Sequence, residues 1–417
     1  MIMLKSVRYR TGRYTKSKAW IVLFVWIICL FYVLFQGGKT SIMLFGMVTL
    51  LSIYLLIGQF GGARRAVGTR QLTSSGEHTE LLHAGDQVHV QLGLQIPGLL
   101  PLPYVIVREV LKRHNGESWS FEESLVPNMR GSGKLVFLTP PLERGKYKFM
   151  ETECISEDIF GLIEHKGTFN VYGSFRVLPR TVFIPYWQLY DQNSRLSGPQ
   201  AALTRSRRET TQINGVRDYV YGDRLSRIHW NATAKTGQWK SKEFEHESLP
   251  KTILVLDATE EGYKSSEQFE LAVSTAASLL EYGNRERLSM GLCTISEETK
   301  LFLPTDSQNE RQKMIQHLVD LDYTGTSDLL SSIQDSIRSF PQGAFFVLIS
   351  PLDNANILES LRYAGTRGMT ASHIRIEQRA SQAHKSEWLT LLRGRGIKGY
   401  AVSDLQELPS AMGGGGL

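Results

Sequence analysis

The sequence lacks the paired cysteines and the short motifs on which many enzyme and metal sites depend. Its 417 residues include only Cys29, Cys154 and Cys293, and no two of them are close together. An odd count without a close pair argues against a disulfide framework or a zinc site, so we expect small apolar side chains in a reducing compartment. Phosphate loops (Gly-x-x-x-x-Gly-Lys-Ser/Thr), nucleophile elbows (Gly-x-Ser-x-Gly) and HExxH motifs are also absent. We therefore expect no enzymatic activity.

Acidic residues are missing from the first 70 positions, which hold ten lysines and arginines. Residues 71–417 carry 37 basic and 41 acidic side chains, so the net charge of +6 comes entirely from the N-terminal region. Residues 71–417 thus carry a slight excess of acidic side chains and lack the basic surface that nucleic-acid binding requires. We therefore expect no nucleic-acid binding. Basic residues beside apolar runs instead pair with anionic lipid.

Charged residues are absent from two long apolar stretches, residues 19–38 and 40–63, which are separated only by Lys39. Each stretch has about 20 residues or more, which at ~1.5 Å per residue spans roughly 30 Å of hydrocarbon. We expect two transmembrane helices and contact with the lipid bilayer. A cleaved signal peptide is the alternative, and it is disfavoured because no small-x-small cleavage site is seen and a second apolar run follows at once.

The basic residues around these stretches predict the orientation. Six precede the first stretch, and Arg64, Arg65 and Arg70 follow the second, whereas the link has only Lys39. The positive-inside rule then places both termini and the soluble domains in the cytoplasm.

Residues 64–185 show short runs in which apolar and polar residues alternate. Turn residues such as Gly85-Asp86 and Asn115-Gly116 separate the runs. This period of two predicts an antiparallel β-sandwich. The predicted strands include residues 87–92, 104–107, 134–138, 146–149 and 175–178.

From residue 251 the pattern changes to continuous apolar runs that alternate with helical periods. Ile253–Leu256 and Ala344–Ile349 are typical of strands buried on both faces, and residues 268–282 have a helical pattern. Alternating strands and helices predict a doubly wound, mostly parallel sheet over residues 251–410, with a flexible tail at 411–417. Ligands of such sheets bind beyond the carboxyl ends of the strands.

Between these two regions, charged and aromatic residues are dense from Gly215 to Asp257. Tyr221-Gly222-Asp223 predicts a turn, with Asp223 as the N-cap of a short helix. An apolar-leaning stripe through Leu225, Ile228, His229 and Ala232 would form one face of that helix, and Gly237 would end it.

The charged, aromatic and glycine positions of this stretch recur in a defined order, at Gly215, Arg217, Asp218, Tyr219, Gly222, Asp223, Arg227, His229, Trp230, Glu243 and Glu245. In this order they resemble the signature of the bacterial domain-of-unknown-function-58 family. The resemblance covers about the last half of the chain and implies that the signature leads into a von Willebrand factor A-like domain. It also implies a bacterial membrane protein encoded beside two partners, a MoxR-type AAA+ ATPase and a transglutaminase-like membrane protein. The family has no established reaction.

A metal site is one alternative at the end of the first strand. A von Willebrand A domain with a metal-ion-dependent adhesion site has Asp-x-Ser-x-Ser there, and Asp257 and Thr259 match in part while Glu261 replaces the second hydroxyl. Thr326 and Asp353 would supply the remaining oxygen ligands for Mg²⁺. Because the motif is incomplete, we expect no cofactor and a structural role for Asp257.

His229 is the one histidine that lies in a dense polar motif, near Arg217, Asp218, Asp223 and Arg227. It could serve as a general base, since its ordinary pKa lies near neutrality. We expect instead that these residues form an ion-paired joint that holds the signature segment against the α/β domain, because arginine meets carboxylates in two-point fashion.

The sequence thus predicts an α+β multidomain protein of the bacterial cell membrane that acts as a non-enzymatic adaptor for protein partners. One alternative is a metal-dependent ligand-binding protein or hydrolase-like enzyme that uses Arg217, Asp223, His229 and Asp257. Another is an adhesion module outside the cell. The predicted order is a basic cytoplasmic N-terminus (1–18), a two-helix transmembrane hairpin (19–63), a β-sandwich (64–185), a connector with the signature (186–250), a von Willebrand A-like α/β domain (251–410) and a tail (411–417).

Overall fold

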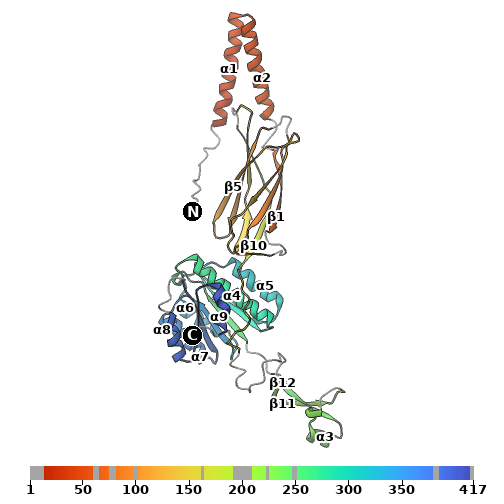
Figure 1. Cartoon of the computed structure of the whole chain (residues 1–417), viewed down its shortest axis with the longest axis vertical. Coiled ribbons are helices and arrows are strands. Elements are labelled where there is room, and N and C mark those ends of the chain that lie inside the picture. Colours follow the sequence, from red (N-terminus) through yellow and green to blue (C-terminus); the bar gives the residue numbers. More distant parts are fainter. Residues whose placement is uncertain are drawn as a thin grey trace. The chain divides into compact units, whose positions relative to one another are not determined.

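The computed structural model forms two compact units, residues 1–179 and 180–417. It has the coarse α+β class with mixed sheets that the sequence predicts (Figure 1). The predicted end of the β-sandwich at residue 185 differs from the division at residue 179. The structure describes residues 14–59, 65–74, 81–97, 102–160, 164–190, 209–221, 225–246, 251–378 and 385–413.

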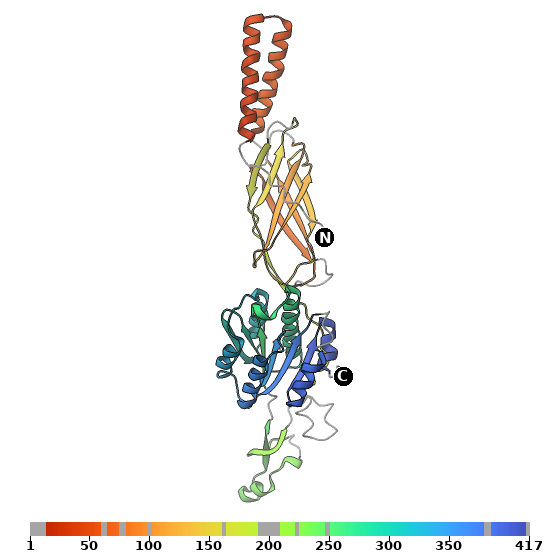
Figure 2. The same cartoon turned by 90° about the vertical axis from the view of Figure 1, so that its left-hand side faces the viewer.

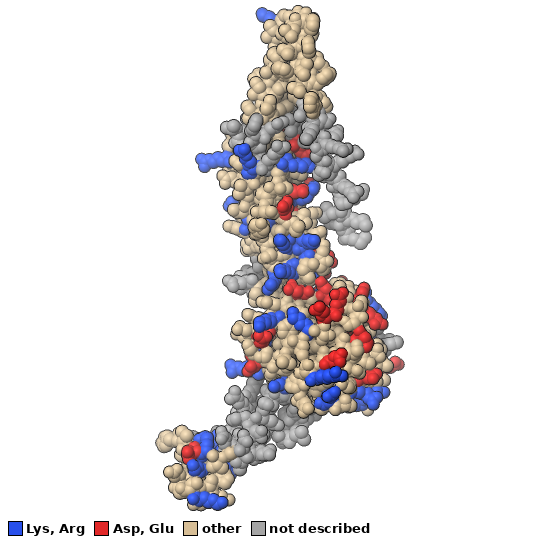
Figure 3. Space-filling model, turned by 180° about the vertical axis from the view of Figure 1, so that it is seen from behind, with Lys and Arg blue, Asp and Glu red and all other residues tan. Residues whose placement is uncertain are grey.

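Two apolar helices begin the first unit, α1 (Tyr14–Gln36) and α2 (Lys39–Gln59). They lie side by side, and Trp26 Nε1 donates a hydrogen bond to Thr49 Oγ1 at 3.1 Å (Figures 1 and 2). In Figure 3 this helical segment shows no acidic side chains. By length and composition, residues 39–57 of α2 could cross a membrane, whereas residues 20–36 of α1 form a shorter apolar helix. Membrane association is supported at this coarse level, and a two-span hairpin stays a prediction.

The β domain of this unit consists of two sheets that share their core. The first has the antiparallel order β1 (Val67–Ser74), β3 (Val88–Gln95), β6 (Ser132–Leu138). The second has the order β2-β10-β7-β4-β8-β9 with β5 paired to β4, and only the β2–β10 pair is parallel. Its strands are β2 (Leu82–His83), β4 (Val105–Arg113), β5 (Ser118–Leu125), β7 (Gly145–Phe149), β8 (Thr152–Glu157), β9 (Glu164–Phe169) and β10 (Ser174–Leu178).

The predicted alternation explains how these sheets pack. In β4 every second residue is buried, as expected for a strand with one face on the core. Leu92 and Leu135 of the first sheet meet Val105 and Cys154 of the second in one buried cluster. The described strands of this region thus form two mostly antiparallel sheets that share a core, and the assignment of residues 64–185 to an antiparallel β-sandwich stays a prediction.

A buried ion pair fixes the first strand to the second sheet. Arg70 on β1 donates to the Glu109 carboxylate at 2.6 Å and to the carbonyl oxygen of Val171. Its guanidinium also lies 3.9 Å from the centre of the Phe149 ring. Both charged side chains are almost fully buried, so removal of either partner would leave an uncompensated charge in the core.

The second unit is built on a six-stranded sheet with the order β15-β14-β13-β16-β17-β18. All pairs are parallel except β14–β15. Helices cover both faces of the sheet (Figure 2). The elements are β13 (Thr252–Asp257), α4 (Ser266–Arg285), β14 (Met290–Ile295), β15 (Thr299–Thr305), α5 (Gln308–Asp320), α6 (Leu329–Ile337), β16 (Phe345–Ser350), α7 (Ala355–Thr366), β17 (Thr370–Ile376), α8 (Lys385–Gly394), β18 (Lys398–Val402) and α9 (Leu408–Met412).

The start of the second unit contributes to the core of the α/β domain. Ile184, Trp187 and Leu189 are buried there together with residues of α4 and the central strands. The Trp187 ring meets the Tyr282 ring of α4 edge to face, with 5.9 Å between the ring centres. Residues 186–190, predicted as the beginning of a connector, are thus packed against the α/β domain. The rest of the polar stretch at residues 191–208 lies outside the described residues.

Candidate functional site

The signature segment forms a β-hairpin with a short helix between its strands. β11 (Glu209–Asp218) pairs antiparallel with β12 (Lys240–His246), so that Gly215 lies opposite Glu243. A single 3₁₀ turn at Leu225–Arg227 and helix α3 (Trp230–Thr236) connect the strands. We call this element the signature hairpin. The sequence interpretation recognised its motif but not its strands.

The helix in the signature hairpin begins later than predicted. Its N-cap is His229, whose Nδ1 accepts a hydrogen bond from the Ala232 N–H at 3.1 Å. The predicted cap, Asp223, lies with Gly222 outside the described residues, and the predicted continuous helical stripe is wrong. The stripe is broken because Ile228 pairs with Ser241 of β12 and buries its side chain. Gly237 ends the helix in the left-handed conformation, as predicted.

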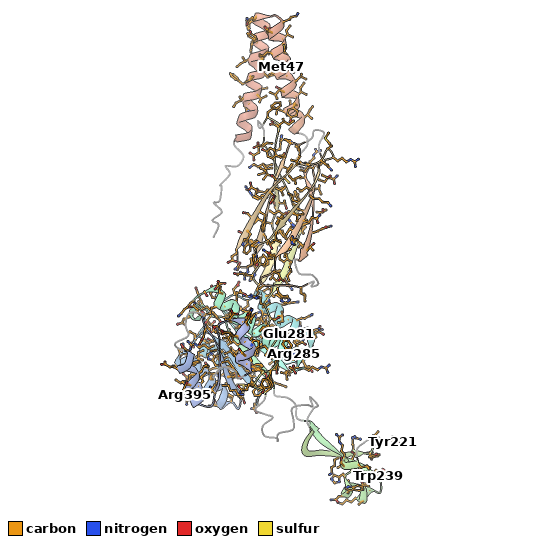
Figure 4. All side chains as sticks on the ribbon, in the orientation of Figure 1. Met47, Tyr221, Trp239, Glu281, Arg285 and Arg395 are labelled. Atoms are coloured by element: carbon orange, nitrogen blue, oxygen red, sulfur yellow. The ribbon has the colours of Figure 1, made fainter. Side chains whose placement is uncertain are left out.

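Aromatic side chains of the signature hairpin are exposed to solvent. Tyr221 is 100 % exposed, and more than half of each indole of Trp230 and Trp239 is accessible. The Trp239 ring lies 5.7 Å from Tyr219 and 6.3 Å from Trp230, measured between ring centres. We call these four residues the aromatic face; Figure 4 labels Tyr221 and Trp239 on this element. A pocket of about 590 Å³ adjoins them, lined by Asp218, Tyr219, Tyr221, Leu225, Gln238 and Trp239.

The charged residues of the signature make contacts within the hairpin. Lys240 Nζ lies 2.5 Å from Asp218 Oδ1, across the two strands. Arg217 donates a hydrogen bond to the backbone oxygen of Asp218 at 3.1 Å. The Asp218 carboxylate is largely exposed, so this pair contributes at most about 1 kcal/mol to stability. The predicted joint with the α/β domain stays a prediction.

A second candidate site lies at the carboxyl end of β13, where the strand order reverses between β13 and β16. Asp257 Oδ1 accepts hydrogen bonds from the N–H and the hydroxyl of Thr259, at 3.0 and 2.7 Å. Asp257 Oδ2 accepts one from the Ser350 hydroxyl at 2.7 Å. Burial raises the pKa of this carboxyl, although its hydrogen bonds oppose the shift. The sequence placed Ser350 at a strand end beside the predicted site, but its hydrogen bond to Asp257 was not predicted.

The other predicted metal ligands have different surroundings. Thr326 is exposed and follows Gly325, whose backbone pairs with Thr259. The Asp353 carboxylate lies 3.0 Å from the Arg375 guanidinium. The described ranges contain no group of three or more His, Cys, Asp or Glu side chains arranged around a metal ion. The metal site and its absence both stay predictions.

The cysteines of the two globular domains are buried thiols. Burial raises the pKa of Cys154 to about 12 and that of Cys293 to about 11. Because the thiolate is the nucleophile, both side chains are poor candidates for covalent chemistry. All three cysteines are free and buried, and they fill space as small apolar groups.

Part of the chain is similar to a known protein family and to a protein of Bacillus subtilis. Residues 215–383, from the signature hairpin into the α/β domain, match the family model described as "Protein of unknown function DUF58". The uncharacterized protein YeaD of Bacillus subtilis (strain 168) is 25% identical over 296 residues, which are 69% of this chain and 70% of that protein. The two findings support the resemblance to this family that the signature predicts.

Solved structures give a weaker comparison. Two structures of proximal thread matrix protein 1 from the mussel byssus are 11% and 13% identical to this chain. Each match covers 40% of this chain and 47% or 46% of the mussel protein, with TM-scores of 0.29 and 0.28. Scores this low do not relate the two folds.

Proposed function

We propose that the protein is a membrane-anchored, non-enzymatic adaptor that binds a protein partner through the aromatic face of its signature hairpin. The observation that carries the proposal is the exposure of Tyr221, Trp230 and Trp239 on the signature hairpin. Tryptophan and tyrosine are the residues most enriched at the energetic centres of protein interfaces. Exposed apolar side chains gathered in one place mark such surfaces.

The energy available from this surface is sufficient for specific binding. An aromatic side chain buries about 150–250 Å², which at roughly 25 cal/mol per Å² is worth about 4–6 kcal/mol before the costs of association. Two such anchors would support a micromolar complex. A two-stranded hairpin is only marginally stable by itself, so a partner that covers the aromatic face would also stabilise it.

The identity of the partner follows from the family resemblance. We propose a MoxR-type AAA+ ATPase, with a transglutaminase-like membrane protein in the same assembly. The mixed six-stranded sheet supports a von Willebrand A-like assignment for the α/β domain, which would be a second surface for these partners. The apolar helices α1 and α2 support anchoring by two spans. The arginines that follow α2 favour a cytoplasmic position for the folded domains.

A binding measurement with matched variants tests the proposal. The full chain is reconstituted in nanodiscs, and a MoxR-type AAA+ ATPase from the same bacterium is titrated by biolayer interferometry. Tyr221→Ala and Trp230→Ala are each expected to weaken binding about tenfold or more, which corresponds to ~1.4 kcal/mol. The control is Tyr172→Ala, because Tyr172 is also highly exposed, at 87 %, but lies in the β domain.

The outcomes separate the alternatives. Loss of affinity in the hairpin variants alone supports the aromatic face as the docking surface. No binding by the unmodified chain, or equal binding by all variants, would contradict the proposal.

A further inference from the structure

Several connections meet at the end of the β domain from which α2 enters. Val67, the first residue of β1, lies opposite Gln95 of β3, which lies opposite Ser132 of β6. In the second sheet, Val105 of β4 lies opposite Leu125 of β5 and Ser156 of β8. Leu125, Ser132 and Ser156, which lie next to the β5–β6 and β8–β9 connections, are therefore at the same end of their sheets as Val67, the first residue of β1.

The β8–β9 connection is in direct contact with α2. The Tyr54 hydroxyl of α2 accepts a hydrogen bond from the Ile159 N–H at 3.3 Å. The Tyr54 ring also meets the Phe160 ring edge to face, with 5.9 Å between ring centres. Asp158 accepts a hydrogen bond from the Phe160 N–H at 2.7 Å, which holds the tip of the connection in a turn.

Apolar side chains on these two connections are exposed. Met129 is 90 % exposed and Ile159 is 63 % exposed, and Val126 and Phe160 are similarly accessible. We call these four residues the apolar rim. Arg130 is exposed beside Met129. Large apolar side chains next to a basic one are typical of a surface that lies at the boundary between lipid headgroups and acyl chains.

Tyr54 indicates how deep the rim would lie in a bilayer. The apolar segment of α2 runs to Ile57, only three residues beyond Tyr54, or about 4.5 Å along the helix axis. Tyrosine is enriched at this level of membrane helices because its ring prefers the interface. Phe160 and Ile159, which contact Tyr54, are therefore held at the interfacial end of α2.

We propose that the apolar rim inserts into the surface of the bilayer that α2 enters, so that the β domain has a lipid contact of its own. This inference rests on the membrane anchoring in the proposed function. The partner is the lipid surface rather than another protein, because the rim is continuous with the end of the apolar helix. The β domain is then fixed against the membrane by its loops as well as by its covalent link.

Accessibility of nitroxide labels to oxygen and to a nickel chelate tests the inference. The full chain is reconstituted in vesicles of phosphatidylethanolamine and phosphatidylglycerol. Met129→Cys and Ile159→Cys are labelled in separate samples, and the three native cysteines are buried and should stay unlabelled. Both labels are expected to collide more with oxygen, which concentrates in lipid, than with the chelate, which stays in water.

Two controls make the result decisive. Leu81→Cys replaces an exposed apolar residue next to β2. Through β10 and β7, β2 lies at the Arg113 end of β4, which is the end opposite to Val105 and the apolar rim. The label at residue 81 should show the reverse ratio. Leu50→Cys, on the exposed surface of α2, reports on the membrane anchor itself. If the label at residue 50 collides more with oxygen, but the labels at residues 129 and 159 collide more with the chelate, only this inference is overturned. An aqueous signal at residue 50 would overturn the proposed anchoring as well.

Discussion

The α/β domain and the signature hairpin are neighbours in the sequence, yet they use apolar residues in opposite ways. Every residue of β13, β14 and β16 is buried. The hairpin buries Ile228 but exposes Tyr221, Trp230 and Trp239. Apolar side chains inside a sheet stabilise the fold, whereas those on a thin hairpin contribute little to it until another surface covers them. The difference separates strands whose side chains are all buried from a hairpin whose aromatic side chains are accessible to solvent.

Acidic residues of the two regions show the same contrast. Asp257 is fully buried and accepts three hydrogen bonds from Thr259 and Ser350. Asp218 is largely exposed and pairs across the hairpin strands with Lys240. A carboxylate in the core is costly unless its oxygens are satisfied, whereas one at the surface is solvated by water.

The largest expected difference in stability is between a leucine truncated in the α/β domain and a leucine truncated in the signature hairpin. Leu348→Ala in β16 should lower the free energy of unfolding of the α/β domain by about 3 kcal/mol, because it leaves a cavity between sheet and helices. Leu225→Ala in the hairpin should change it by less than about 0.5 kcal/mol, since that side chain is exposed. Hydrogen exchange of the central-strand amides in the full chain measures both. Equal effects would show that the hairpin is part of the same cooperative core.

A smaller effect is expected for the two aspartates. Asp257→Ala should destabilise the α/β domain by about 2 kcal/mol, because it leaves buried donors of Thr259 and Ser350 without an acceptor. The matched change Asp218→Ala should cost below about 1 kcal/mol. Thermal unfolding of the full chain in detergent gives the comparison.

Adding Mg²⁺ to the same samples separates a structural carboxylate from a metal ligand. If Asp257 has only a structural role, we expect that Mg²⁺ neither releases heat in calorimetry nor raises the unfolding temperature. Binding of Mg²⁺ by the unmodified chain that Asp257→Ala abolishes would favour the metal-dependent alternative.

The smallest expected effect is a dependence of stability on pH in the α/β domain. His317 on α5 has its Nε2 2.7 Å from the Thr294 hydroxyl, and burial lowers its pKa from 6.5 to about 4. Because the native state favours the neutral imidazole, this stabilisation is complete above pH 6.5 and is lost as the pH falls toward 4. We expect a loss of about 1–2 kcal/mol, allowing for solvent screening at this half-buried site.

The variant His317→Gln isolates this contribution. Glutamine keeps a polar partner for Thr294 but does not titrate, so the variant's stability should fall less between pH 6.5 and 4. Urea unfolding at a series of pH values provides the difference between the two chains. Parallel curves would mean that His317 is protonated as easily in the folded state as in the unfolded one.

The sequence predicted the buried parts of this chain well, because burial on both faces produces a continuous apolar run. Ile253–Leu256 and the run ending at Ile349 are central strands, as expected. The edge strand β15 was missed, since its residues are only partly buried and include Pro304, which is unfavourable in central strands. Trp187 was assigned to a connector because the residues that follow it are mostly polar, and this pattern gives no sign that Trp187 packs in the α/β core.

The candidate site was predicted only as a motif. Its strands carry no period of two that could be recognised, because neither face of a two-stranded hairpin faces a core. The pairing of Ile228 with Ser241, which breaks the expected helix, depends on a contact between segments that the local sequence does not encode. The exposure of Trp230 and Tyr221 likewise depends on the tertiary arrangement of the chain, which composition alone cannot reveal.

Arg70 gives the β domain a mechanical property. Force arriving along α2 enters the domain at Val67 and runs along β1, whose eight residues pair with β3. The interstrand hydrogen bonds would then be sheared together rather than opened one after another, and the ion pair of Arg70 with Glu109 would carry part of the load into the second sheet. A load applied along the chain would therefore be shared between the two sheets of the β domain.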